Sequence, residues 1–271
     1  MKNRIEHDYA PGSDLYEKHL GSALFEPYAV DLAEKIAADC TQGSVLEMAC
    51  GTGILTQQLR ARLKPSVSLT ATDLNPGMLE YAQKKLNGVE GITWRPADIT
   101  DLPFPNASFD VVVCQFGLMF AADKDRAFCE MRRILLNGGL LALSVWDRLE
   151  TNSWGLIVQE TVSGFFPKNP SQFFKAPFNS HDVDALRSLL IAHGFDQIEI
   201  HAVSKECYST TAKGLAIGMI QGSPLLAEIQ ERGGSPEPIV DAVAAIYART
   251  GGDNPYRAPM QAIVATARAS G

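Results

Sequence analysis

The chain has 271 residues, of which 46% are hydrophobic and 20% are charged. This composition is typical of a globular protein and excludes a disordered or collagen-like chain. Lys and Arg number 24 against 31 Asp and Glu, a net charge of −7, which argues against nucleic acid as the main partner. The five cysteines include no C-x-x-C pair, so we expect a reducing compartment and no disulfide framework. With no apolar run of bilayer length and no signal-peptide core near residue 1, we expect a cytoplasmic protein without a membrane span.

From residue 44 the chain alternates between two kinds of segment. Apolar and β-branched runs predict five strands, at 44–48, 67–72, 92–96, 110–115 and 140–145. Residues spaced for one helical face predict three helices between them, at 54–63, after Asn75-Pro76, and at 124–136, where Asn137-Gly138-Gly139 would end the helix. Such alternation predicts an α/β fold with a parallel sheet covered by helices on both faces.

After residue 145 the pattern becomes less regular. The segment 151–179 is rich in aromatic residues and proline, and 212–249 is mostly helical with breaks. A helix is expected at 182–192 with Ser180 as its cap, followed by strands at 195–203 and 260–267. The first part therefore forms a regular α/β core, and the rest completes the sheet and adds a helical cover.

The most informative segment is Glu47-Met48-Ala49-Cys50-Gly51-Thr52-Gly53, between a predicted strand and a predicted helix. Glycine lets a ligand approach the backbone, and a helix start offers free N–H groups. Asp73 ends the second strand, 73 − 53 = 20 residues after Gly53, which is the spacing at which a carboxylate reaches a ribose diol. The alternatives are a tight turn without ligand and a solvent-facing aspartate, although Asn75 already serves to cap the next helix.

The turn departs from the dinucleotide-binding pattern. G-x-G-x-x-G requires a third glycine at position 56, where the chain has Thr56, and that glycine permits close helix packing around a pyrophosphate. The acidic Glu47 beside the turn would also repel a pyrophosphate. Both features disfavour a nicotinamide-dependent oxidoreductase and favour a nucleoside that carries a cationic centre and an amine.

Four ordered motifs now resemble those of one family. VLEMACGTG, ATDLNPGMLEYAQKK, WRPADITDLPFPNASFDVVVCQFGLMF and EMRRILLNGGLLALSVW are similar to the motifs of class I S-adenosylmethionine-dependent methyltransferases, in the branch of the ubiquinone and menaquinone C-methyltransferases. The resemblance implies a doubly wound, mostly parallel, seven-stranded Rossmann-like sheet with an antiparallel last strand and a helical cap. It further implies an arm at 1–40, a cofactor-binding core at 41–150, covering insertions at 151–193 and 212–250, and sheet-completing strands at 194–211 and 251–271.

The resemblance also implies a role for individual residues towards S-adenosylmethionine, with S-adenosylhomocysteine as product. Glu47 would contact the methionine amino group, and Asp73 the ribose hydroxyls. Asp98 would accept a hydrogen bond from the adenine amino group. The remaining implied cofactor contacts are the loop floor Ala49, Cys50, Gly51 and Gly53, the adenine neighbours Leu74, Met78, Ala97 and Ile99, and Gln115 and Phe116 near the methyl group. The reaction would be in-line attack on the sulfonium methyl by a small-molecule acceptor.

The general base is not identified by the sequence. His181 is the best histidine candidate, with a surface role as the alternative. His193 suits a helix C-terminus. Tyr9, Tyr16 and Tyr28 either close the site or pack in the core.

Cys50 is better explained as loop lining than as a nucleophile, and Cys114 as strand core. Phe165, Phe166, Phe173, Phe174 and Phe178 line an apolar pocket or form ordinary core. No spacing suits a metal site, the oligomeric state stays open, and a non-catalytic cofactor-binding protein is the remaining alternative.

Overall fold

The computed structural model describes residues 12–271, so Tyr9 lies outside the described residues. The chain forms two compact units. The sheet unit comprises Tyr28–Trp146, Asn179–Val203 and Ala262–Gly271. The helical unit comprises the described residues up to Pro27, Asp147–Phe178 and Ser204–Gln261.

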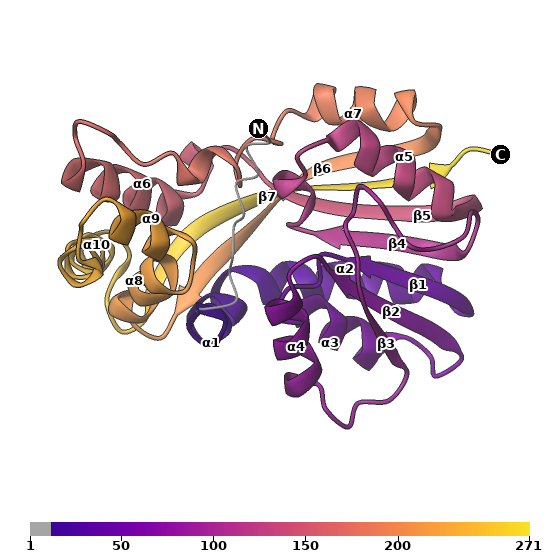
Figure 1. Cartoon of the computed structure of the whole chain (residues 1–271), viewed down its shortest axis with the longest axis horizontal. Helices are drawn as coiled ribbons and strands as arrows, with labels where there is room; N and C mark the ends of the chain where they lie inside the picture. The colour runs from indigo at the N-terminus through magenta and orange to yellow at the C-terminus, as the bar shows by residue number, and fades with distance from the viewer. Residues whose placement is uncertain (1–11) are drawn as a thin grey trace. The chain divides into compact units, whose positions relative to one another are not determined.

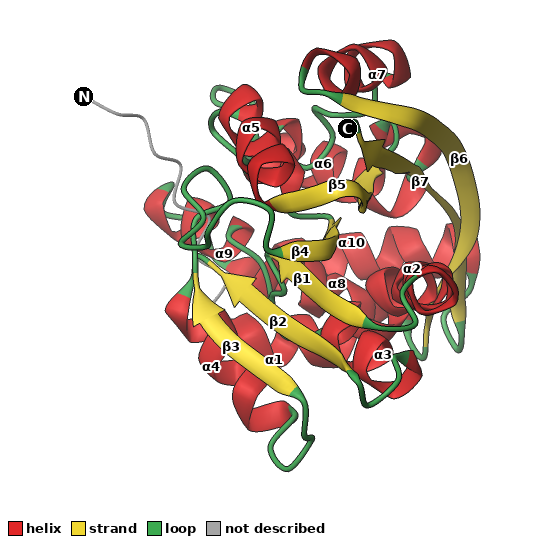
Figure 2. Cartoon of the chain, turned by 90° about the vertical axis from the view of Figure 1, so that its right-hand side faces the viewer, coloured by secondary structure: helices red, strands yellow, loops and turns green. Residues whose placement is uncertain are grey.

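The sheet has seven strands in the order β3-β2-β1-β4-β5-β7-β6. Their bounds are β1 Gly43–Met48, β2 Val67–Asp73, β3 Ile92–Pro96, β4 Phe109–Gln115, β5 Leu135–Trp146, β6 Phe195–Ser209 and β7 Tyr256–Ala269. Strands β3, β2, β1, β4 and β5 pair in parallel, and β7 runs antiparallel to β5. Figure 2 shows β3, β2, β1 and β4 side by side. The predicted mostly parallel sheet with an antiparallel last strand is therefore confirmed.

Helices follow the strands of the sheet unit as the sequence pattern predicts. They are α2 Glu26–Asp39, whose first two residues lie in the helical unit, α3 Ile54–Arg62, α4 Pro76–Lys85, η3 Leu118–Phe120, α5 Lys124–Ile134 and α7 Val183–Ala192. Asn75 caps α4 as expected, since its side chain accepts hydrogen bonds from Gly77 N at 2.9 Å and Met78 N at 3.2 Å. This cap fixes where α4 begins, immediately beyond the end of β2.

Both faces of the central strands are buried, which explains their continuous apolar sequences. Val45, Leu69 and Val111 share one face, and their cluster also contains Leu32 of α2 and Leu59 of α3. The alternate strand residues Leu46, Met48, Val112, Cys114, Leu141 and Leu143 are buried as well. On α5 and α7, which contact each other, the buried residues include Phe128, Met131, Leu186 and Leu190. Two helical layers thus enclose the sheet.

The helical unit contains α1 Ser13–Tyr16, the π-helix η2 Glu17–Phe25, η4 Leu149–Thr151, α6 Ser153–Phe165, η5 Phe173–Lys175, α8 Ala212–Gln221, α9 Leu225–Glu231 and α10 Pro236–Gly251. Helix α10 packs against α6 and α8 (Figure 1). The Tyr247 hydroxyl of α10 donates to the Trp154 carbonyl of α6 at 2.6 Å. Phe173, Phe174 and Phe178 are buried within this unit or at its edge, whereas Phe165 is 46% exposed.

Two details differ from the sequence-based expectations. Asp182, and not Ser180, caps α7, because its side chain accepts from Asp184 N and Ala185 N while the Ser180 hydroxyl donates to Asn179. Helix α5 ends at Ile134, since Leu135 already pairs with β4. Residues 179–193 lie in the sheet unit, where α7 contacts α5. None of the helices in the described residues is long and apolar enough to span a membrane.

Candidate functional site

The order of the strands locates the candidate site. From β1 the chain continues outward through β2 and β3 on one side of the sheet. It then returns to the other side of β1 and continues outward through β4 and β5, so the strand order reverses at β1. Ligands of open α/β sheets bind at such a reversal, beyond the carboxyl ends of the strands. Here β1 and β4 are paired in parallel, with Met48 opposite Cys114, so their carboxyl ends lie together. The segments that follow these two strands therefore face the same edge.

The loop between β1 and α3 has an unusual backbone. Ala49, Gly51 and Gly53 have φ values of 53°, 56° and 78°, in the left-handed region that side chains disfavour. A Cβ added to Gly51 would have no neighbour within 4 Å. Gly53 is the N-cap of α3 and supplies no capping side chain. The first N–H groups of α3 thus have no side-chain cap, and Gly51 leaves open space beside the loop.

Asp73 connects the carboxyl ends of β2 and β1. Its Oδ2 accepts from Gly51 N and its Oδ1 from Asn75 N, each at 2.8 Å. Burial raises the pKa of this carboxyl above its ordinary value, although the backbone N–H groups that it accepts from oppose the rise. Leu74 N is a further backbone donor to this carboxyl. The carboxylate is therefore held at the ends of β1 and β2, and its remaining lone pairs can accept hydroxyl groups of a ligand.

Glu47 is the buried acid of the site, with 2% exposure. Its Oε2 has no hydrogen-bond partner among the described residues. Desolvation raises the pKa of Glu47 to about 8, hydrogen bonding by Thr56 opposes the rise, and the charge of Asp73 adds to it. A buried acceptor without a partner is costly. An ammonium group bound next to Glu47 would satisfy this oxygen and favour the ionised carboxylate.

The residues expected at an adenine ring lie beyond β2 and β3. Ala97 N donates to the Asp73 carbonyl at 3.1 Å, so the ends of β2 and β3 are joined there. Leu74 follows Asp73 and Asp98 follows Ala97, which places these two residues next to this hydrogen bond. Leu74 is 51% exposed, while Met78 is buried. Asp98 Oδ1 accepts from both N and Oγ1 of Thr100, at 2.8 and 2.7 Å. The exposed side chain of Leu74 and the carboxylate of Asp98, oriented by Thr100, thus occur at the same edge of the sheet. Ile99, which follows Asp98, is half-buried.

The end of β4 is closed by aromatic side chains. Phe116 has a φ of 54°, and its N–H donates to the Ser144 carbonyl at 2.9 Å. Its ring stacks on Trp146 with a centroid distance of 4.1 Å, and Tyr28 contacts both rings edge-on at 5.5 and 5.7 Å. Tyr28 is 1% exposed and donates to the Val203 carbonyl. Tyr28 is therefore packed in this cluster, next to the half-buried Gln115.

The other candidate reactive groups have different surroundings. Burial raises the pKa of the Cys50 thiol well above its usual range, and burial raises that of Cys114 to about 12. Both cysteines therefore stay protonated near neutral pH and are poor nucleophiles. His193 follows α7, with Nδ1 2.8 Å from the Leu189 carbonyl. Tyr16 stacks on Phe25 within the helical unit. Among residues 12–271, no three His, Cys, Asp or Glu side chains form a group suited to a metal ion.

Sequence reasoning missed Gly117. A Cβ at this position would lie 2.4 Å from Ala49 Cβ and 2.9 Å from Cys114 Sγ. The loops after β1 and β4 are therefore in contact at a point where only glycine fits. The signal was present in the run Gln115-Phe116-Gly117 but does not reveal its partner, because Ala49 is far away in the sequence.

Comparisons with known proteins identify relatives of this chain by sequence and by fold. Residues 46–143 match the family model described as "Methyltransferase domain". The ubiquinone/menaquinone biosynthesis C-methyltransferase UbiE of Pseudomonas aeruginosa (strain LESB58) is 31% identical over 173 residues, which are 58% of this chain and 66% of that protein. The chain thus spans just under two thirds of the length of this curated relative.

Solved structures share the fold at low sequence identity. The phosphoethanolamine N-methyltransferase 2 of Haemonchus contortus, in complex with S-adenosyl-L-methionine, has a TM-score of 0.62 at 14% identity, covering 97% of this chain and 57% of that one. The YcgJ protein of Bacillus subtilis has a TM-score of 0.59 at 16% identity, covering 90% and 99%. These likenesses concern the fold alone.

Proposed function

Because residues 46–143 match a methyltransferase domain and the chain is similar to a C-methyltransferase, we propose that the whole chain transfers a methyl group from S-adenosylmethionine to a small-molecule acceptor. When bound, S-adenosylmethionine supplies an electrophilic methyl group on a sulfonium sulfur, open to in-line attack. The tasks of the protein are then to hold the cofactor, to orient the acceptor and to exclude water. Orientation of this kind contributes up to about 7–11 kcal/mol to the lowering of a barrier.

One observation carries the proposal. At the strand-order reversal, Asp73 holds Gly51 N at 2.8 Å while the Cα of Gly51 faces a space without any atom within 4 Å of an added Cβ. Such open space also occurs at surface turns, for example at Gly88, but a tight turn without ligand would not leave Glu47 Oε2 buried without a partner. Both features fit a ligand with a sugar diol and an ammonium group.

The proposed cofactor contacts follow from these positions. Glu47 binds the ammonium group, Asp73 the ribose hydroxyls, and Asp98 the adenine amino group. The exposed Leu74 and the buried Met78 provide apolar contact for the ring. The other proposed contacts are the backbone of Ala49, Cys50, Gly51, Gly53, Ala97 and Ile99, and at the methyl end Gln115 and Phe116.

The acceptor is proposed by chemical class. The first class to test is a quinol ring carbon, because the Pseudomonas relative is named as a ubiquinone/menaquinone biosynthesis C-methyltransferase. We further propose that residues 151–193 and 212–250 influence the choice of acceptor. Within them, Phe165 of α6 is 46% exposed, second among the large apolar side chains to Ile191 of α7 at 61%. Phe165→Ser is the substitution that tests this role in the helical unit.

A transfer assay tests the proposal. Purified chain is incubated with S-adenosylmethionine labelled with tritium in its methyl group and with quinols, phenols, amines or lipids in separate reactions. We expect transfer to at least one class and its loss in Asp73→Ala. If the chain binds S-adenosylhomocysteine well yet labels none of the acceptors, the non-catalytic, cofactor-binding alternative is favoured.

A further inference from the structure

The segment between β3 and β4 has an irregular backbone, although it contains Asp98 and Ile99. Residues 97–108 form neither helix nor strand, apart from an isolated bridge between Asp98 and Asp101. Pro103 and Pro105 provide no N–H donors. Backbone carbonyls in such a segment need partners from elsewhere if they are not to be left unsatisfied. The conformation of this segment therefore depends on side chains that reach it.

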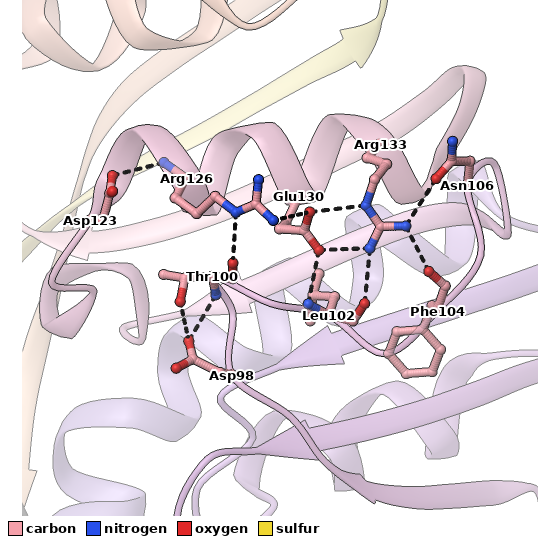
Figure 3. Close-up of polar contacts among 9 residues, drawn as sticks. All are labelled: Asp98, Thr100, Leu102, Phe104, Asn106, Asp123, Arg126, Glu130 and Arg133. Carbon is pink, nitrogen blue, oxygen red and sulfur yellow. Dashed lines mark hydrogen bonds and ion pairs between the residues drawn. The ribbon is translucent and has the colours of Figure 1, made fainter.

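Two arginines of α5 supply these partners, as Figure 3 shows. Arg126 Nε donates to the Thr100 carbonyl at 3.1 Å. Arg133 Nη2 donates to the Leu102 carbonyl at 2.9 Å, and its Nη1 donates to the Phe104 carbonyl at 2.7 Å. Every second carbonyl from residue 100 to residue 104 is thus held by a guanidinium group. Arg133 Nη1 also donates to Asn106 Oδ1 at 3.0 Å, at the far end of the segment.

Glu130 links the two arginines to each other and to the segment. Its side chain is 3% exposed. Glu130 Oε2 accepts from Leu102 N at 2.9 Å and from Arg133 Nη2 at 2.6 Å, and Oε1 accepts from Arg133 Nε at 2.9 Å and lies 3.5 Å from Arg126 Nη2. Hydrogen bonding by Arg133 holds the pKa of this carboxyl below its ordinary value. A fork-to-fork pair of this kind fixes orientation as well as distance.

The network ends two residues from the carboxylate expected to recognise the adenine amino group. Thr100, whose carbonyl Arg126 holds, donates to Asp98 Oδ1 through both its N–H and its hydroxyl. On the other side of Asp98, Ala97 N donates to the Asp73 carbonyl. Asp98 is therefore held from both sides, by β2 and by α5.

We propose that Arg126, Glu130 and Arg133 are positioning residues for cofactor recognition: through Thr100 they fix Asp98 and Ile99 in the geometry that distinguishes adenine from other purines. This proposal rests on the proposed function, which assigns Asp98 to the adenine amino group. The three residues act through the loop and touch no ligand themselves. Their loss should therefore reduce base discrimination and not only stability, because a loop free to shift can present other partners to the base.

The experiment compares two ligands that differ at one position of the base. S-Inosylhomocysteine carries a carbonyl where S-adenosylhomocysteine carries its amino group, so an acceptor at Asp98 disfavours it. Calorimetry measures the ratio of the two affinities for the full wild-type chain, for Arg126→Gln and for Glu130→Gln. Arg126 is the milder site, since its side chain is 55% exposed. We expect each substitution to reduce the ratio by about fivefold, which corresponds to one lost hydrogen bond.

Arg132→Gln is the matched control. Arg132 lies on the same helix and also donates to a backbone carbonyl, but that carbonyl belongs to Ser270 and not to the 97–108 segment. The Arg132→Gln variant should leave the ratio of the two affinities unchanged. An unchanged ratio in Arg126→Gln, or an equal fall in Arg132→Gln, would overturn the proposal; if Glu130→Gln fails to fold, Arg126→Gln decides alone. Absence of S-adenosylhomocysteine binding by the wild-type chain would instead refute the proposed function.

Discussion

The side chain of Asp73 and the backbone of Gly51 are joined by a 2.8 Å hydrogen bond across the carboxyl ends of β2 and β1. The bond fixes the glycine loop relative to the carboxylate that is proposed to hold the ribose. Asp73 therefore serves two purposes, since some of its lone pairs accept from backbone N–H groups and the others remain for a ligand. Asp110 provides a natural comparison at the opposite end of the sheet, where its Oδ2 accepts from Ser44 N at 2.8 Å.

Asp73→Ala should weaken the binding of S-adenosylhomocysteine by about tenfold or more, because two charge-assisted hydroxyl bonds disappear. Calorimetric titration measures the affinity, and thermal unfolding measures the accompanying loss of stability. Asp110→Ala removes a comparable carboxylate–backbone bond at the amino ends of β1 and β4. It should destabilise the protein without changing the affinity. Equal affinities for wild type and Asp73→Ala would show that the ribose lies elsewhere.

Gly51→Ala separates backbone strain from ligand exclusion. With φ at 56° and no atom near the added Cβ, alanine should cost roughly 1 kcal/mol of stability through strain alone. In the proposed complex the same methyl group meets the cofactor, so affinity for S-adenosylhomocysteine should fall by about tenfold or more. Gly88→Ala is the control, since Gly88 has a φ of 85° and equally open surroundings. If both substitutions weaken binding alike, Gly51 does not face the ligand.

Glu47 should make cofactor binding depend on pH. Its carboxyl, with a pKa of about 8 in the ligand-free protein, must ionise to bind an ammonium group. Affinity for S-adenosylhomocysteine should therefore rise with pH towards 8, by up to about tenfold per unit. Calorimetry in buffers of different ionisation enthalpy measures the released proton. Methylthioadenosine lacks the amino group and should show no such slope; the same slope for both ligands would contradict the assignment.

The same pKa affects stability in a defined direction. Since burial raises the pKa of Glu47 from 4.5 to about 8, the folded state holds a proton that the unfolded state has already lost within this window. The free energy of unfolding should consequently decrease as pH rises through it. Glu47→Gln cannot ionise and should show a smaller decrease when urea unfolding is followed from acidic to alkaline pH. A steeper decrease in Glu47→Gln would argue against a neutral Glu47 in the folded protein.

Tyr247→Phe should affect the helical unit alone. It removes the hydroxyl that donates to the buried Trp154 carbonyl at 2.6 Å, and an acceptor left without a partner costs about 1–3 kcal/mol. Urea unfolding measures this loss. Tyr208→Phe is the control, because Tyr208 is 45% exposed. Affinity for S-adenosylhomocysteine should be the same in both, since Asp73 and Gly51 belong to the sheet unit; a selective loss in Tyr247→Phe would contradict this.

Local sequence patterns predict much of the fold. The alternating strands and helices and the cap at Asn75 are confirmed, because periodicity and capping act over a few residues. The antiparallel last strand is also confirmed, but it was implied by the family resemblance and not by a local pattern. The prediction of Ser180 as the cap of α7 is wrong, because Asp182 takes that position. Ser and Asp are both good caps, and the sequence pattern does not fix the residue at which the helix begins.

The internal geometry of the candidate site is beyond such patterns. Asp73 holds Gly51, and Gly117 approaches Ala49 closely, only because the sheet brings separate strand ends together. The buried Glu47 carboxyl depends likewise on tertiary packing. The arginine contacts to residues 97–108 join segments that are not neighbours in sequence, and EMRR by itself indicates an exposed, charged helix face.

The most direct test of the account is calorimetric titration of the full chain with S-adenosylhomocysteine and, separately, with NAD. A nucleoside held at Asp73 with an amine at Glu47 should give saturable binding of the homocysteine ligand at one site per chain and no response to NAD. Tight binding of NAD without any heat from S-adenosylhomocysteine would contradict the account.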